Sequence, residues 1–198
     1  RLIYDSVGSM DASSELFELM RSFGVQVLEY RPIAPWKQRF GIFGRDHRKI
    51  LVVDDQLGYI GGFNVGDFWS EAISREASWR DTHLRMQGPA SLDLVVLFAE
   101  TWYRETGKLM PVNEEAVHEQ HFPRSLDVES DLSGGALIIG GRGHYRRRIR
   151  RLYELEIGRA REHLLLTNPY MVPDHAIREA LCQAADRGVD VRLLLPEQ

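Results

Sequence analysis

Residues 47–64 read HRKILVVDDQLGYIGGFN, and this stretch indicates both a β-hairpin and a phosphate site. Its apolar segments, 48–53 and 58–62, flank a polar turn, which predicts two short strands. Its polar residues follow the pattern H-x-K-x4-D and then G-G-x-N; they are His47, Lys49, Asp54, Gly61, Gly62 and Asn64. The His, Lys and Asp would match by chance in about one chain in a hundred of this length. Adding the last Gly-x-x-Asn positions makes a coincidence roughly a few hundredfold rarer, so the motif is a strong signal.

The residue types suit a phosphate group. Side chains alternate along a strand, so His47 and Lys49 project from the same side, about 6–7 Å apart. A histidine beside a lysine makes poor structural sense, because the ammonium disfavours a protonated imidazole. Around a phosphate, the lysine neutralises an oxygen while the neutral imidazole attacks phosphorus. The Gly61–Gly62 pair allows close backbone approach, and the Asn64 amide can donate to the same oxygens. Gly62 is also consistent with plain hairpin geometry.

Asp54 differs from the other motif residues. Its separation of seven from His47 places it on the opposite face of the strand, so it does not orient His47 within the same lobe. We expect it to fix a turn or to make a contact across lobes.

The rest of the chain alternates strands and helices, which predicts an α/β fold: a mixed sheet flanked by helices. The expected strands are 1–5, 25–28, 83–87, 136–139, 164–167 and 189–195, and the expected helices are 13–23, 91–106, 145–161 and 174–187. A Pro-containing aromatic stretch, 32–43, is interpreted as a loop over the site. The polar stretch around 111–134 has no periodicity and is interpreted as a linker or an excursion from the lobe.

The two ends of the chain resemble each other. RLIYD at 1–5 and VRLLLP at 191–196 are both arginine-led apolar strands that reach a polar turn. This weak repeat predicts one nearly complete lobe at 1–110 and the start of a pseudo-symmetric second lobe at 135–198. Both ends look cut. None of the other six histidines has a lysine two residues later, so a second H-x-K motif is expected beyond Gln198.

Composition bounds the function. The net charge is −4, which argues against a protein whose whole surface binds nucleic acid. The apolar fraction, 43%, is ordinary for a soluble globular protein. The single cysteine, Cys182, excludes a disulfide framework and is interpreted as a small core residue.

The longest apolar run, Leu94–Ala99, is far too short to span a membrane. Six arginines at 142–151 fit a solvated helix face, or alternatively an anionic lipid surface or polyanionic substrate.

The motif resembles that of the phospholipase D superfamily. The resemblance implies two such motifs, one per lobe, that form one active site without metal or cofactor. One histidine becomes a covalent phosphohistidine, and the other protonates the leaving group and then activates the acceptor. It assigns the nucleophile-or-acid role to His47, phosphate binding to Lys49 and Asn64, and motif membership to Asp54. Gly62 departs from the serine often found there, so a hydroxyl near the phosphate is absent.

The neighbourhood is similar to one family within it, the bacterial cardiolipin synthases. The similar segments are WRDTHLRMQGPA from Trp79, FAETW from Phe98, TGK from Thr106, TNPYMVPD from Thr167 and AADRGVDVRLLLP from Ala184. The resemblance implies that Asp81 holds the catalytic imidazole by a hydrogen bond, although a surface carboxylate at a strand end is the alternative.

The implied activity is transfer of a phosphatidyl group between alcohols through a phosphohistidine. The alternatives are phosphodiester hydrolysis, of phospholipid or nucleic acid, and a non-catalytic scaffold with a degenerate half-site. The expected partners are a phospholipid similar to phosphatidylglycerol, a membrane surface, and a second lobe in cis or from a partner chain, with no nucleic acid. The expected place is the cytoplasmic side of a bacterial membrane, as a peripheral protein.

Overall fold

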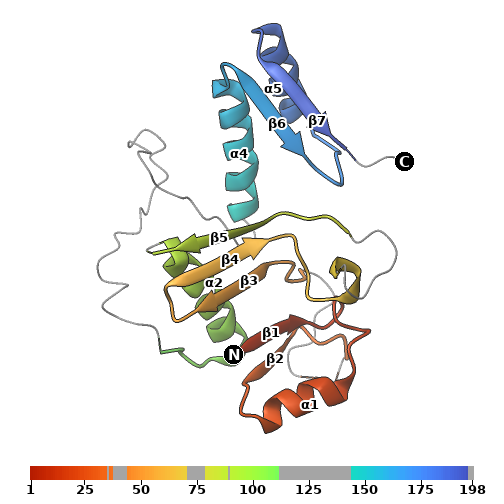
Figure 1. The fold of residues 1–198 in the computed structure, drawn as a ribbon, viewed down its shortest axis with the longest axis vertical. Coiled ribbons are helices and arrows are strands. Elements are labelled where there is room, and N and C mark those ends of the chain that lie inside the picture. The colour runs from red at the N-terminus through yellow and green to blue at the C-terminus, as the bar shows by residue number, and fades with distance from the viewer. Residues whose placement is uncertain (35, 38–43, 71–78, 89, 112–143, 196–198) are drawn as a thin grey trace. The chain divides into compact units, whose positions relative to one another are not determined.

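The structure is a computed structural model that describes residues 1–34, 36–37, 44–70, 79–88, 90–111 and 144–195, without the side chains of 144–148. The chain divides into two compact units, 1–138 and 139–198 (Figure 1). The first contains β1 (Leu2–Asp5), α1 (Ser14–Ser22), β2 (Val27–Tyr30), β3 (Lys49–Val53), β4 (Leu57–Gly61), the short 3₁₀ helix η1 (Asp67–Trp69), β5 (His83–Gln87) and α2 (Ala90–Thr106). The second contains α4 (His144–Arg159), β6 (His163–Thr167), α5 (His175–Asp186) and β7 (Asp190–Leu194).

β1, α1 and β2 form a β-α-β unit with two parallel strands. Leu2 pairs with Val27 and Asp5 with Tyr30, so both strands end at the same edge. The Ser13 side chain caps α1 by accepting from the backbone N–H of Leu16. β2 begins two residues later than expected, because the N–H of Val25 donates to the carbonyl of Met20 and closes the end of the helix.

β3, β4 and β5 form an antiparallel sheet, with β4 in the middle and α2 packed against it (Figure 1). Asp54 and Asp55 both adopt positive φ, 53° and 55°, and the N–H of Gln56 donates to the carbonyl of Val53. This is the type I′ geometry that favours short hairpins, and Asp is among the few non-glycine residues that tolerate it. The predicted polar turn is therefore confirmed, and Ser91 of α2 holds it through the carbonyl of Asp55, at 2.8 Å.

The second unit is another β-α-β arrangement, with β6 and β7 parallel and α4 packed against α5. Its core is built from Ile157, Leu181, Ala184 and Val189. Asp174 caps α5 by accepting from the N–H of Ile177, and it pairs with Arg150 of α4. The hydrogen bond from Arg150 and the capping bond lower the pKa of Asp174 to about 2.

The structure confirms the α/β fold class and the helix and strand positions that it describes, to within two residues at each end. The expected strand 136–139 and linker 111–134, apart from residue 111, lie outside the described residues, as does most of the loop 32–43. The lobe boundaries and the pseudo-symmetry stay predictions. Cys182 was interpreted as a core residue; this is wrong, because its side chain is exposed on α5. Among the described helices, none is both long and apolar enough to cross a bilayer.

Candidate active site

His47 lies two residues before β3, on the segment that enters the antiparallel sheet. Its imidazole is exposed and makes no hydrogen bond within the part of the chain that the structure describes. Its orientation therefore depends on how the backbone of residues 45–49 is held.

Arg48 holds that backbone against α2. Its guanidinium donates to the hydroxyl of Thr101 at 2.7 Å and forms an ion pair with Asp46. Burial alone would raise the pKa of Asp46, but the hydrogen bonds and charge of Arg48 outweigh it and hold that pKa below the ordinary value. Because side chains alternate along an extended chain, His47 and Lys49 project to the side away from α2. The predicted pairing of these two residues on one face fits this arrangement.

Lys49 is the first residue of β3 and is half-buried. Its ammonium donates to the carbonyl of His47 at 2.7 Å, so the cation lies next to the His47 backbone. Burial lowers the pKa of Lys49 below its ordinary value, while the carboxylates of Asp46, Asp81 and Asp5 act in the opposite direction. An ammonium that is partly desolvated attracts an incoming anion more strongly than one fully in water.

Gly61 and Gly62 lie where the segment before β5 crosses the end of β4. A side chain at position 61 would overlap the carbonyl of Thr82 and lie 2.7 Å from the Cα of His83, and one at position 62 would overlap the carboxylate of Asp81. The N–H of Gly62 already donates to the carbonyl of Thr82, at 3.1 Å. Both glycines thus have a packing reason, and substrate contact by their backbone stays a prediction.

The two glycines should respond differently to substitution. Gly61→Ala meets backbone atoms that cannot move without breaking the β4–β5 ladder, so it should lower the free energy of unfolding by about 1–3 kcal/mol. The three atoms nearest to a Cβ at position 62 all belong to the exposed Asp81 side chain, which can rotate away, so the cost of Gly62→Ala should be smaller. Thermal unfolding of both variants measures the order. Equal melting temperatures for the two would contradict this explanation of the glycine pair.

Asp81 lies just before β5 and is exposed. One of its oxygens accepts from the N–H of Thr82 at 2.7 Å, and it makes no hydrogen bond to His47 in this structure. Its carboxylate does lie beside the motif, because a Cβ at Gly62 would overlap Asp81 Oδ1. Its implied role as the partner of the imidazole stays a prediction.

The structure does not bring Asp54 to His47. Asp54 is exposed in the hairpin turn at the far end of β3, seven residues away, which corresponds to about 23 Å along a strand. A turn role within this lobe fits that place, and a cross-lobe contact stays a prediction. Asn64 is half-buried and lies three residues after the end of β4, the end that pairs with Lys49.

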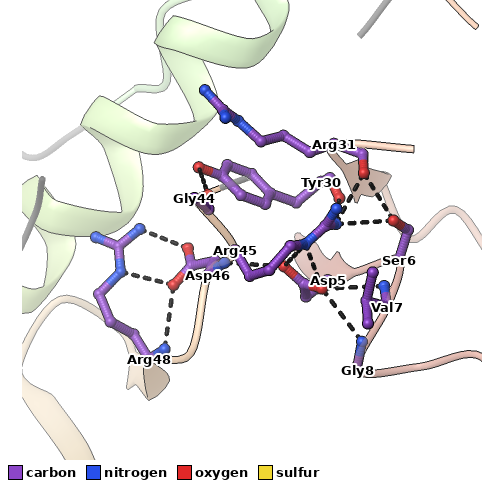
Figure 2. Close-up of polar contacts among 10 residues, drawn as sticks. All are labelled: Asp5, Ser6, Val7, Gly8, Tyr30, Arg31, Gly44, Arg45, Asp46 and Arg48. Carbon is purple, nitrogen blue, oxygen red and sulfur yellow. Dashed lines mark hydrogen bonds and ion pairs between the residues drawn. The ribbon is translucent and has the colours of Figure 1, made fainter. Parts of the chain in front are cut away.

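Sequence reasoning missed two residues that hold this site, Asp5 and Arg45. Figure 2 shows Arg45 reaching from the segment before His47 to the Asp5 carboxylate at the end of β1, with both Nε–O distances 3.0 Å. The contact joins residues forty positions apart, one at the end of β1 and one in the segment before β3. The only sequence signals were an Asp at a strand end and an Arg in a loop, which are common in any α/β protein.

Comparisons with known proteins bear on this site. The family model described as "Cardiolipin synthase, PLD-like domain" matches residues 153–198, within the second unit. Cardiolipin synthase 2 of Bacillus cereus is 36% identical over the whole chain, and so is the cardiolipin synthase of Geobacillus thermodenitrificans. Cardiolipin synthase A of Pseudomonas syringae is also 36% identical over the whole chain. The chain belongs to the phospholipase D superfamily. No solved structure matches this phospholipase D-like chain.

The match covers only part of each relative. This phospholipase D-like chain spans 37%, 38% and 39% of the length of those three proteins. The resemblance drawn from the motif and its neighbouring segments is confirmed. The activity, substrates and partners of the whole protein are matters for a proposal.

Proposed function

We propose that the protein transfers a phosphatidyl group between two alcohols through a phosphohistidine, as a cardiolipin synthase would. The observation that carries this is the placement of His47 and Lys49. Arg48 anchors the strand to α2, which leaves an exposed imidazole and a half-buried ammonium on the opposite side. The similarity to proteins named cardiolipin synthases, over the whole chain, supports the phosphatidyl group as the one transferred.

The reaction needs two imidazoles in succession. A ring nitrogen of one histidine attacks phosphorus, and the bond from phosphorus to the headgroup oxygen breaks. The second histidine donates its proton to that departing oxygen. It then takes a proton from the hydroxyl of an acceptor alcohol, whose oxygen attacks the phosphohistidine and frees the first ring. His47 fills one of these two roles.

Lys49 and Asn64 would bind the phosphate oxygens during both steps. The Lys49 ammonium offsets the negative charge that grows on the non-bridging oxygens, and the Asn64 amide can donate a hydrogen bond. Asp81 would support the positive charge on an imidazolium. The lipid substrate implies a membrane surface, and we propose that the protein acts there as a peripheral protein on the cytoplasmic side.

The full-length protein tests this with vesicles of phosphatidylglycerol. Transfer to a second lipid releases one free glycerol for each cardiolipin formed. Chromatography of the lipids and assay of free glycerol should give that one-to-one ratio. Phosphatidic acid as the main product would contradict transfer and favour hydrolysis. No conversion of any phosphodiester would favour a non-catalytic scaffold.

Transfer should not depend on a divalent ion. Lys49 and Asn64 already supply the charge and the donor that a metal would bring to the phosphate. We expect the rate of the full-length protein to be unchanged within error after chelation with EDTA and dialysis. A rate that disappears on chelation and returns with one divalent ion would contradict this; vesicle integrity is checked in parallel, since divalent ions also bind anionic lipid.

A further inference from the structure

The segment that leads into the motif crosses the ends of two parallel strands. Asp5 is the last residue of β1 and Tyr30 the last of β2, and the two are paired in the sheet. Arg45 lies across both ends. Its Nε donates to the Asp5 carboxylate, and its Nη2 donates to the carbonyls of Tyr30 at 3.0 Å and Arg31 at 2.8 Å (Figure 2). The guanidinium thus joins the β1–β2 sheet to the chain two residues before His47.

The same carboxylate also holds the next residue. The backbone N–H of Asp46 donates to Asp5 Oδ2 at 2.8 Å. On its other side Asp5 Oδ1 accepts from the N–H groups of Val7 and Gly8, at 3.0 and 3.2 Å, which fixes the carboxylate itself. One side chain therefore positions two consecutive residues, 45 and 46, directly ahead of the imidazole.

Asp5 is buried enough to make these contacts specific. Its side chain is 10% exposed and that of Arg45 is 22% exposed. Burial alone would raise the pKa of Asp5, but the hydrogen bonds from Arg45 and from the backbone N–H groups outweigh it and lower that pKa. The carboxylate is therefore ionised near neutral pH and accepts all of these bonds.

His47 is consequently held from both sides along the chain. Asp5 fixes residues 45 and 46, and the contacts of Arg48 with Asp46 and Thr101 fix the residue after it. The imidazole makes no hydrogen bond of its own to any described residue, so these contacts hold the backbone from which it projects.

We propose that Asp5 is a positioning residue for phosphatidyl transfer, which acts through Arg45 and the N–H of Asp46 to aim His47 at the phosphate. Asp5 itself does not touch the substrate. The inference rests on the proposed function, because aim matters only if His47 reacts. A displacement of about 1 Å at a reacting group can cost on the order of 100-fold in rate, whereas binding of the lipid depends on other groups.

The test is Asp5→Asn in the full-length protein. This variant keeps the size of the side chain, but one carboxylate oxygen becomes an NH₂ group. The amide therefore cannot accept the hydrogen bonds that the two Asp5 oxygens accept from Arg45 and from the N–H of Asp46. The matched control is Glu18→Gln, which removes an exposed carboxylate of α1 that pairs with Arg21 at 4.0 Å in the same unit. We expect kcat of Asp5→Asn to fall about 10–100-fold with KM changed less than about threefold. Glu18→Gln should keep the wild-type kcat.

Two further variants sharpen the result. Arg45→Met combined with Asp5→Asn should be about as slow as the slower single variant, because both break one linkage. Arg45→Lys keeps a charge beside Asp5 but cannot reach both the carboxylate and the carbonyls at the end of β2, so its kcat should be partly reduced. This variant replaces Asp5→Asn in the test if Asp5→Asn does not fold. Circular dichroism and melting temperature show which variants are folded.

Three outcomes would overturn the inference. The first is a wild-type kcat for folded Asp5→Asn, or for Arg45→Lys where Asp5→Asn is unfolded. The second is a loss of activity that matches the unfolded fraction of the variant. The third is a raised KM with an unchanged kcat. His47→Ala is assayed beside them. If His47→Ala remains active, the proposed function itself fails; if it is inactive while Asp5→Asn has full kcat, only the positioning role fails.

Discussion

Replacing His47 with alanine should abolish phosphatidyl transfer while the fold remains. The exposed imidazole contributes little packing and makes no hydrogen bond to any described residue, so the melting temperature should change little. Losing a general acid costs about 10²–10⁴-fold in rate, and losing a nucleophile costs more. Headgroup exchange by the full-length variant, measured with radiolabelled glycerol, gives the residual rate.

The control is His163→Ala, which removes another exposed histidine at the start of a strand, β6. It should exchange headgroups at the wild-type rate. More than about a tenth of wild-type turnover in His47→Ala would contradict either catalytic role.

A modified substrate separates the two roles of His47. A phosphatidyl ester of p-nitrophenol has a leaving group that departs without protonation. If His47 is the acid, His47→Ala should still release a first burst of nitrophenolate. If His47 is the nucleophile, the burst should be absent.

The 198-residue chain alone should show no turnover. An imidazole bonded to phosphorus cannot also donate a proton to the departing oxygen, and an unprotonated alkoxide is a poor leaving group near neutral pH. Activity therefore requires a second H-x-K motif, in cis or from a partner chain. Turnover of phosphatidylglycerol by the purified chain is measured beside the full-length protein.

The mass of the chain in solution decides how a positive result is interpreted. Robust turnover by a folded monomer would contradict the two-motif requirement. Turnover that appears only with a dimer would place two copies of His47 about a two-fold axis and contradict the arrangement in cis. Circular dichroism confirms that the purified chain is folded, so that a lack of turnover reports on chemistry.

The local features of this site could be predicted because they depend on short-range rules. Alternation along a strand predicted that His47 and Lys49 share a face, and the anchoring of Arg48 to α2 on the other side fits it. The turn at Asp54 followed from two apolar segments around a polar one, and both Asp residues there adopt the left-handed backbone that such a turn needs.

Other features could not be predicted because they depend on which distant segments meet. The motif itself does not show that Asp5 lies beside Arg45, since that contact requires the packing of β1 against the segment before β3. The glycine pair was interpreted as an approach for the phosphate, and that role stays a prediction. The structure adds a packing reason that the sequence did not indicate, because a side chain at either position would overlap the segment before β5. The spacing of residues in the sequence predicts which face of a strand a side chain occupies. It does not predict which distant segment packs against that face.

The central claim is that His47 belongs to a half-site that transfers phosphatidyl groups through a histidine. The most direct test is to quench the full-length protein in alkali during turnover of phosphatidylglycerol, where phosphohistidine survives, and to map the adduct by mass spectrometry. The account predicts a phosphatidyl group on a histidine ring in the wild type. In His47→Ala it predicts no adduct if His47 is the nucleophile, and an adduct on another histidine that forms about 10²–10⁴-fold more slowly if His47 is the acid. An adduct that forms in His47→Ala at the wild-type rate, or full turnover of the wild type without any histidine adduct, would contradict it.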